Sequence, residues 1–297
     1  MNVLRLRNER AERLGRLQRE FDIRSPGLND PVHLIQHLRD PEEIELAAFI
    51  GSALAFGRIE LFKPVIQRLL QLGGGELKTY LACFTPSRER PAFDGLYYRI
   101  WSKDDLICLF YALRQILTRY GSLKNLFIEC AKREDDHFGP AISGFSDEFV
   151  RFNPAPVYGI NQFTRSFKAF VPSPRNGSAC KRFCLFLRWM IRKDGFDRGT
   201  WQELSPARLV VPLDVHIHRV GLFLKLTRRR TANWKTAIDI TRSLREIDRD
   251  DPLKFDFPLC HFSIRGECLS RAKGKLCGLC DPFHQCYFGR IDRDLPR

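Results

Sequence analysis

At 297 residues the chain is long enough for one large or two modest domains with hydrophobic cores. With 44% hydrophobic and 12% aromatic residues and no low-complexity segment, its composition excludes a disordered or fibrous protein. The formal net charge of +14 favours polyanionic partners, nucleic acid first, over a merely soluble basic protein. Membrane-surface binding ranks lower, because the basic residues are scattered over several segments.

The N-terminal stretch to Phe21 predicts a helix, and its arginines are either a solvated face or a binding surface. Residues 1–10 carry charge throughout and lack the apolar core of a signal peptide. No segment approaches the roughly 20 apolar residues of a membrane span. We therefore expect a cytoplasmic protein with no membrane partner.

Three segments of the first half predict helices. Residues 41–56 follow the capping residue Asp40, begin with a proline and acidic residues, and are apolar on most sides, as a central helix would be. Residues 59–72 place apolar side chains at helical intervals and stop at three glycines. Residues 103–120 repeat the same spacing.

The second half is also predicted to be helical. Residues 160–170 place phenylalanines at helical intervals, and 208–213 is the one short β-like run, so the fold class is all-α. A proline-containing break at 153–156 separates two lobes. The expected parts are a basic N-terminal helix (1–24), a first helical lobe (25–152), a second helical lobe (153–264), a cysteine loop (265–290) and a tail (291–297).

A proline- and glycine-rich turn precedes a helix that begins near Lys181 and buries Phe183, Phe186, Leu187 and Met190. Gly177 and Ser178 lie where the turn meets the helix, whose N-terminal amides would suit a phosphate. Lys181 and Arg182 in the first turn would strengthen such a site.

Asp214 comes 33 positions after Lys181, where an extended, proline-containing approach turns into a helix. That position predicts a helix cap as its structural role. His216 and His218 would point to opposite sides of the helix, so we expect them to be structural or DNA-facing, with a metal role as the weaker alternative.

Four cysteines near the C-terminus have the spacing C-x8-C-x2-C-x5-C: Cys268, Cys277, Cys280 and Cys286. In a cytosolic protein such thiolates indicate a bound metal or iron–sulfur cluster, while two disulfides or four ordinary thiols are the alternatives. Zinc and a four-iron cluster both accept four thiolates, and His284 is a possible substitute ligand. The spacing leaves that choice open.

The segment 211–220, the helix after it, residues 257–268 and the cysteine loop together resemble the helix-hairpin-helix DNA glycosylase superfamily. In its endonuclease III branch a Val-Asp-Thr-His segment is followed by a [4Fe-4S] loop with the same C-x2-C-x5-C ending. The interval between Lys181 and Asp214 is more similar to that of archaeal 8-oxoguanine glycosylases. Residues 54–58, 177–182 and 186–190 resemble more closely an uncharacterised bacterial family related to these enzymes, over roughly residues 25–290.

This resemblance implies a two-lobed helical fold with a C-terminal cluster loop, and a base-excision glycosylase that flips a damaged base out of double-stranded DNA. Asp214 matches the aspartate that stabilises positive charge on the sugar, and Lys181 matches the lysine that forms a Schiff base and gives AP lyase activity. A [4Fe-4S] cluster, with zinc as the alternative, would organise a DNA-binding loop through Arg271, Lys273 and Lys275.

Two other functions remain open: a nucleic-acid-binding module that has lost base excision, and a structural zinc protein without a nucleic-acid role. The aromatic candidates for base recognition, Phe56, Trp189 and His261, are expected in the core. The sequence therefore assigns no base-reading residue.

Overall fold

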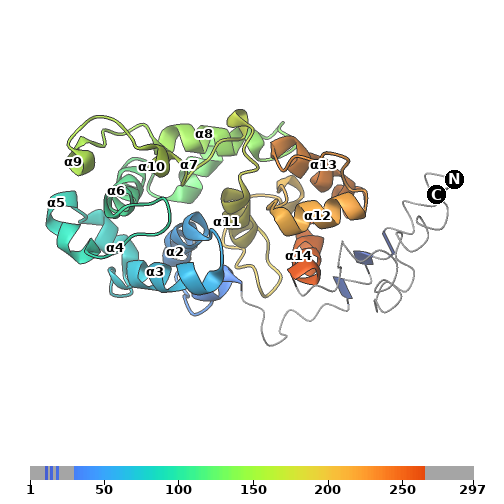
Figure 1. The fold of residues 1–297 in the computed structure, drawn as a ribbon, viewed down its shortest axis with the longest axis horizontal. Coiled ribbons are helices and arrows are strands. Elements are labelled where there is room, and N and C mark those ends of the chain that lie inside the picture. The colour runs from blue at the N-terminus through green and yellow to red at the C-terminus, as the bar shows by residue number, and fades with distance from the viewer. Residues whose placement is uncertain (1–10, 13, 16–17, 20–29, 265–297) are drawn as a thin grey trace. The chain divides into compact units, whose positions relative to one another are not determined.

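The computed structural model describes residues 11–12, 14–15, 18–19 and 30–264 (Figure 1). Over these residues the regular elements are all helical, apart from two isolated bridges, Tyr98–Trp101 and Lys193–Arg198. The all-α prediction is confirmed. None of the described helices is long and apolar enough to cross a membrane.

The chain divides into two compact units, residues 29–208 and residues 209–297 together with 1–28. The larger unit contains η1 (Pro31–Leu34), α2 (Pro41–Leu54), α3 (Ile59–Gln71), α4 (Leu77–Ala82), α5 (Pro86–Glu89), η2 (Arg90–Phe93), α6 (Lys103–Tyr120), α7 (Leu123–Cys130), α8 (Gly139–Phe149), α9 (Ala155–Tyr158), α10 (Arg165–Lys168), η3 (Pro174–Asn176), α11 (Lys181–Ile191) and η4 (Pro206–Arg208). The smaller unit contains α12 (Val215–Phe223), α13 (Trp234–Arg245), η5 (Pro252–Phe255) and α14 (Asp256–Ile264).

Helix α2 is the centre of the larger unit, as its sequence predicts. Asp40 accepts a hydrogen bond from the Glu42 amide and Pro41 takes the first helical position, where its missing N–H is not needed. Every residue from 44 to 54 is buried. Because this part of the helix is covered on all sides, its one acidic residue, Glu45, must find partners inside the protein.

Glu45 on α2 meets this requirement by capping another helix. Its carboxylate accepts hydrogen bonds from the Leu123 amide at 2.6 Å and the Lys124 amide at 3.2 Å, at the start of α7, and from Trp201 Nε1 at 3.0 Å. Burial raises the pKa of Glu45 to about 7, although these hydrogen bonds oppose the shift. The half-buried Glu43 caps α4 in the same way, by accepting hydrogen bonds from the Leu77 and Lys78 amides.

Asp105 on α6 joins residues 158–166 to the larger unit. The side chains of Tyr158, Thr164 and Ser166 donate to its carboxylate at 2.8, 2.5 and 2.9 Å. Burial acts to raise the pKa of Asp105, but these bonds and the Ser102 amide outweigh it and lower the pKa below its ordinary value. Such contacts explain why the compact units divide at residue 208 and not at the proline break at 153–156 that the sequence suggested.

Helix α11 packs against α2 and is buried from residue 183 to 191. The sequence predicted one buried face, and the structure buries the opposite face as well, including Arg188. Its guanidinium lies 3.2 Å from the Asp197 carboxylate, which also pairs with Arg192. Burial raises the pKa of Asp197 to about 6, against the effect of the two arginines. Ion pairing therefore allows a charged residue inside the packed helix.

Residues 160–170 do not form the continuous helix that their spacing predicts. Thr164 begins the four-residue α10 by accepting a hydrogen bond from the Phe167 amide at 3.0 Å. Phe163 and Phe170 still contact Phe167, with ring centroids 5.1 and 5.9 Å apart. The phenylalanine spacing thus serves ring packing around a turn.

The smaller unit begins with residues 209–213, which are all buried and belong to no helix or strand, so their β-like apolar sequence reflects burial. The Val211 amide donates to Thr241 Oγ1 on α13 at 3.0 Å. Helix α12 then packs against α14, and it approaches α13 closely at Gly221, where a Cβ would lie 2.7 Å from Ile240 Cδ1. The N-terminal positions that are described, 11–12, 14–15 and 18–19, are helical, in line with the predicted N-terminal helix.

Candidate nucleic-acid interface

The turn before α11 is held in shape from inside the protein. Gly177 has a φ of 74° and Cys180 a φ of 50°, both in the left-handed region that favours glycine. The buried Cys180 thiol donates to the Pro172 carbonyl at 3.0 Å, and burial raises its pKa to about 12, so it stays protonated. Ser178 Oγ accepts from the Cys180 amide at 3.2 Å. Lys181 follows as the first residue of α11 and is half-buried.

Arg182 directs its guanidinium into the protein. Its two terminal nitrogens donate to the carbonyls of Ala53 and Ala169. The guanidinium lies 4.8 Å from the centroid of the Trp101 ring and 6.0 Å from that of Phe56, within cation–π range. Burial lowers its pKa to about 10, which leaves it charged at neutral pH. Its role as a phosphate contact stays a prediction, since the structure gives these donors main-chain partners.

Arg99 reaches the Phe56 ring from a second segment of the chain. Its guanidinium lies 5.0 Å from the Phe56 ring centroid and 5.9 Å from that of Tyr98. Arg99 Nε donates to the Tyr98 hydroxyl at 3.2 Å, which donates to the Phe56 carbonyl at 2.5 Å. Arg99 has a φ of 52°, a strained conformation for a residue with a side chain, and the bridge between Tyr98 and Trp101 closes the turn around it.

The Trp101 ring contacts both the Phe56 ring and the Arg182 guanidinium. Its ring stacks on Phe170 at 4.8 Å with an interplanar angle of 9°, and its Nε1 donates to the Ser166 carbonyl at 2.9 Å. Trp101 is 1% exposed, whereas Phe56 is 47% exposed. The expectation that Phe56 belongs to the core is therefore wrong, and that for Trp189, which is fully buried, is confirmed.

These residues form one surface, which we call the Phe56 surface: Phe56, Arg99, Trp101 and Arg182. Two guanidinium groups lie within 6.0 Å of one ring centroid, and within the described part of the chain neither pairs with a carboxylate. Two positive charges without a counter-charge attract an anion. Arg99 was not predicted from the sequence, although the aromatic residues around it between 97 and 101 were a signal.

Asp214 lies in the smaller unit and caps α12, as its sequence position predicts. Its Oδ1 accepts from the amides of His216 and Ile217 at 2.9 and 2.8 Å. Its Oδ2 lies 3.9 Å from Cys260 Sγ. The cap fixes the direction of the carboxylate. Lys181 belongs to the larger unit, so the two predicted catalytic residues lie in different units.

The two histidines of this segment have different surroundings. His218 Nε2 lies 2.8 Å from the carbonyl of Arg229, a structural contact within the smaller unit. His216 supplies the amide that Asp214 caps. Across residues 30–264 no three His, Cys, Asp or Glu side chains gather in the manner of a metal site.

Several predicted site residues lie outside the described residues: Cys268, Cys277, Cys280, Cys286, His284, Arg271, Lys273 and Lys275. The side chain of His261 is likewise not described. The four-cysteine site therefore stays a prediction from the sequence, and the chemistry of four thiolates suits both zinc and a cluster.

Residues 30–265 match the family described as "Protein of unknown function (DUF2400)". The chain belongs to this family. The DUF2400 match includes the Phe56 surface, Lys181 and Asp214, and it ends before Cys268. Comparison with curated proteins and with solved structures finds no match.

Proposed function

We propose that this DUF2400 protein binds damaged double-stranded DNA and excises a base from it. The observation that carries the proposal is the Phe56 surface. It offers an exposed ring with two guanidinium groups that have no carboxylate partner in the described chain. Aromatic rings stack on unpaired bases, the exposed Arg99 could bind a phosphate, and the inward-facing Arg182 adds positive charge, so such a surface suits DNA with a base out of the helical stack.

Lys181 and Asp214 are the proposed catalytic residues. An aspartate carboxylate would stabilise the positive charge that develops on the sugar as the glycosidic bond breaks. Both amide hydrogen bonds of the Asp214 cap go to Oδ1, and Oδ2 lies near Cys260 Sγ. A neutral Lys181 amine would bond to sugar C1′ as the base leaves with its electron pair, and ring opening would then give an imine that permits strand cleavage.

The four cysteines would hold the metal group of this protein, a [4Fe-4S] cluster or, as the alternative, zinc. Bound there, the group would fold the basic loop that contains Arg271, Lys273 and Lys275. Cluster binding predicts a brown protein with broad absorption near ~400 nm when purified without air. Stoichiometric zinc without iron or sulfide would decide for zinc instead.

Borohydride trapping tests the lyase step. Duplexes would carry an abasic site, 8-oxoguanine or an oxidised pyrimidine, and the variants would be Lys181→Ala and the matched control Lys168→Ala, an exposed lysine of the same unit. We expect a trapped adduct in the wild type and in the control, and none in Lys181→Ala. Equal trapping by Lys181→Ala would remove Lys181 from the mechanism.

Base release by Asp214→Asn tests the role of the carboxylate charge. Asparagine caps a helix about as well as aspartate, so this variant keeps the α12 cap and removes the negative charge. We expect a fall in base release on the order of 100-fold, the scale of a lost electrostatic contact in a transition state.

A second function, nucleic-acid binding without catalysis, is favoured by the capping of α12, which gives the Asp214 carboxylate a structural role. It predicts that Asp214→Asn releases no less base than the wild type, while DNA affinity still depends on salt. A third class, a structural zinc protein, predicts an affinity that does not change with salt.

A further inference from the structure

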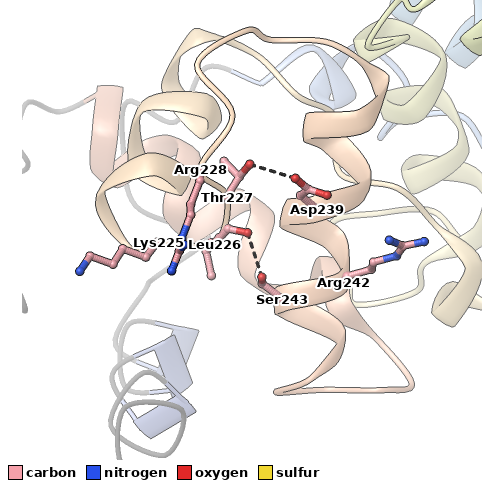
Figure 2. A pocket seen from close by; sticks show the side chains of 7 residues that line it. All are labelled: Lys225, Leu226, Thr227, Arg228, Asp239, Arg242 and Ser243. Atoms are coloured by element: carbon pink, nitrogen blue, oxygen red, sulfur yellow. Dashed lines mark hydrogen bonds between the residues drawn. The ribbon is translucent and has the colours of Figure 1, made fainter. Parts of the chain in front are cut away.

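Beyond the Phe56 surface, the smaller unit has a basic hollow of about 340 Å³ where α12 ends against α13 (Figure 2). We call it the α12–α13 hollow. Its cationic side chains are Lys225 and Arg228, from the segment after α12, and Arg242 from α13. All three are exposed.

The end of α12 explains how Lys225 is placed. The Leu226 amide donates to the Gly221 carbonyl at 2.8 Å, and the Lys225 amide donates to the Leu222 carbonyl at 3.2 Å. This pair of bonds is a Schellman motif, in which the residue after the cap is left-handed and is usually glycine. Lys225 holds that position with a φ of 52°. A strained lysine at a glycine position points to a use for its charge.

The neutral and acidic side chains of the hollow, Thr227, Ser243 and Asp239, already have hydrogen-bond partners in the protein. Arg229 Nε lies 2.7 Å from the Asp239 carboxylate, which also accepts from Thr227 Oγ1 at 3.4 Å. Ser243 Oγ donates to the Leu226 carbonyl at 2.8 Å, as Figure 2 shows. The one carboxylate of the hollow is thus neutralised by an arginine outside its cationic set.

Arg228 and Arg242 keep their charge without a carboxylate partner in the described chain. The neighbouring Arg229 and Arg230 are also exposed. Figure 2 shows Lys225 and Arg242 pointing to opposite sides of the contact between Leu226 and Ser243. Cations that diverge from one hollow reach separate anionic groups, so they suit a polyanion better than one small anion.

We propose that the α12–α13 hollow is a second binding site for the phosphate backbone of a nucleic acid, with Lys225 and Arg242 on different phosphates. The identity of the polyanion as nucleic acid rests on the proposed function. The site itself rests on residues that the proposed reaction does not use.

The test compares the full-length wild type with Lys225→Gln, Arg228→Gln and Arg242→Gln combined. The matched control combines Arg133→Gln, Lys235→Gln and Arg249→Gln, three exposed cations elsewhere in the described chain. Binding to a duplex with an abasic site would be measured by fluorescence anisotropy over a salt series. We expect the slope of log affinity against log salt to become shallower by about 2 in the hollow variant, since the two proposed phosphate contacts, of Lys225 and Arg242, would be lost and each contributes about 0.9.

The control variant is expected to keep the wild-type slope, and circular dichroism would check that both variants fold. Equal slopes for the hollow variant and the wild type, with binding intact, would overturn this inference and leave the proposed function standing. An equal decrease of the slope in the hollow variant and in the control variant would also overturn the inference, because binding would then depend only on total charge. If the wild type shows no salt-dependent DNA affinity, both proposals fail.

A second variant guards against a folding artefact at Lys225. Arg228→Glu with Arg242→Glu leaves the α12 end untouched and reverses two charges. We expect it to lower duplex affinity more than the glutamine variant at low salt. Inorganic phosphate at millimolar concentration should not bind measurably to the hollow. If the wild type binds free phosphate tightly and the glutamine variant does not, the assignment of the ligand as a polyanion is overturned.

Discussion

Arg99 and Gly57 fit together because Gly57 has no side chain: a Cβ there would overlap the Nη2 atom of Arg99. Gly57 has a φ of 96°, and the Arg99 guanidinium fills the space above it while it lies over the Phe56 ring. The exposed ring and its cation are therefore built together from the segment after α2 and the turn at 98–101.

Gly57→Ala, compared with Gly75→Ala, should show whether the position of Arg99 matters for DNA binding as well as for stability. Gly75 provides a matched control, because its φ of 95° is nearly the same but nothing lies within 4 Å of a Cβ there. Each substitution should lower the free energy of unfolding by about 1 kcal/mol through backbone strain. Only Gly57→Ala should also weaken DNA binding, by about tenfold, because it displaces Arg99. Equal affinities for the two variants would contradict the role of Arg99.

Glu45 should make the protein less stable as the pH rises toward neutrality. Its pKa is about 7 in the folded protein against an ordinary value of 4.5, so between these values the folded state holds a proton that the unfolded chain has released. The free energy of unfolding should then fall with rising pH, by at most about 1.4 kcal/mol per pH unit from this group.

Glu45→Gln would remove this contribution. Its amide would place a donor against the Trp201 and Leu123 donors, which costs about 1–3 kcal/mol at every pH. The difference in the free energy of unfolding between the wild type and Glu45→Gln, measured with denaturant from pH 4.5 to 7, should become smaller as the pH rises. A constant difference would show that Glu45 does not titrate in this range.

Asp105 should have the opposite effect on the pH dependence of stability, making the protein more stable as the pH rises. Its folded pKa is lowered, so its contribution is present above the ordinary value of 3.8 and is lost as the pH falls through the folded value. Asp105→Asn should lower the free energy of unfolding by about 1–3 kcal/mol at pH 7, because several donors lose a charged acceptor. The neighbouring Asp104→Asn, which breaks a half-exposed pair with Arg90, should cost less than about 1 kcal/mol.

Lys225→Gly should stabilise the protein and weaken nucleic-acid binding at once. Glycine relieves the left-handed strain at this helix end, which should raise the free energy of unfolding by up to about 1 kcal/mol. The same change at Lys63, inside α3, should lower it by about 1 kcal/mol. Denaturant unfolding of both variants checks the sign, and a loss of stability at Lys225 would show that its conformation carries no strain.

Features that depend on neighbours along the chain could be predicted from the amino-acid sequence. Helical spacing and end signals gave the all-α class, the whole of α6 and the start of α2 at Asp40. The extended approach followed by a helix placed Asp214 at the start of α12. These signals are local, because capping and amphipathic spacing act within a few residues.

Features that depend on residues far apart in the sequence could not be predicted in this way and are seen in the folded protein. Glu45 caps a helix that begins 78 positions later, and Arg182 finds the Ala53 carbonyl 129 positions away. Phe56 looks like a core residue by type, yet the ring is exposed because Trp101 and Phe170 already fill the space beneath it. Burial is set by which segments compete for the same space, and a linear pattern does not contain that competition.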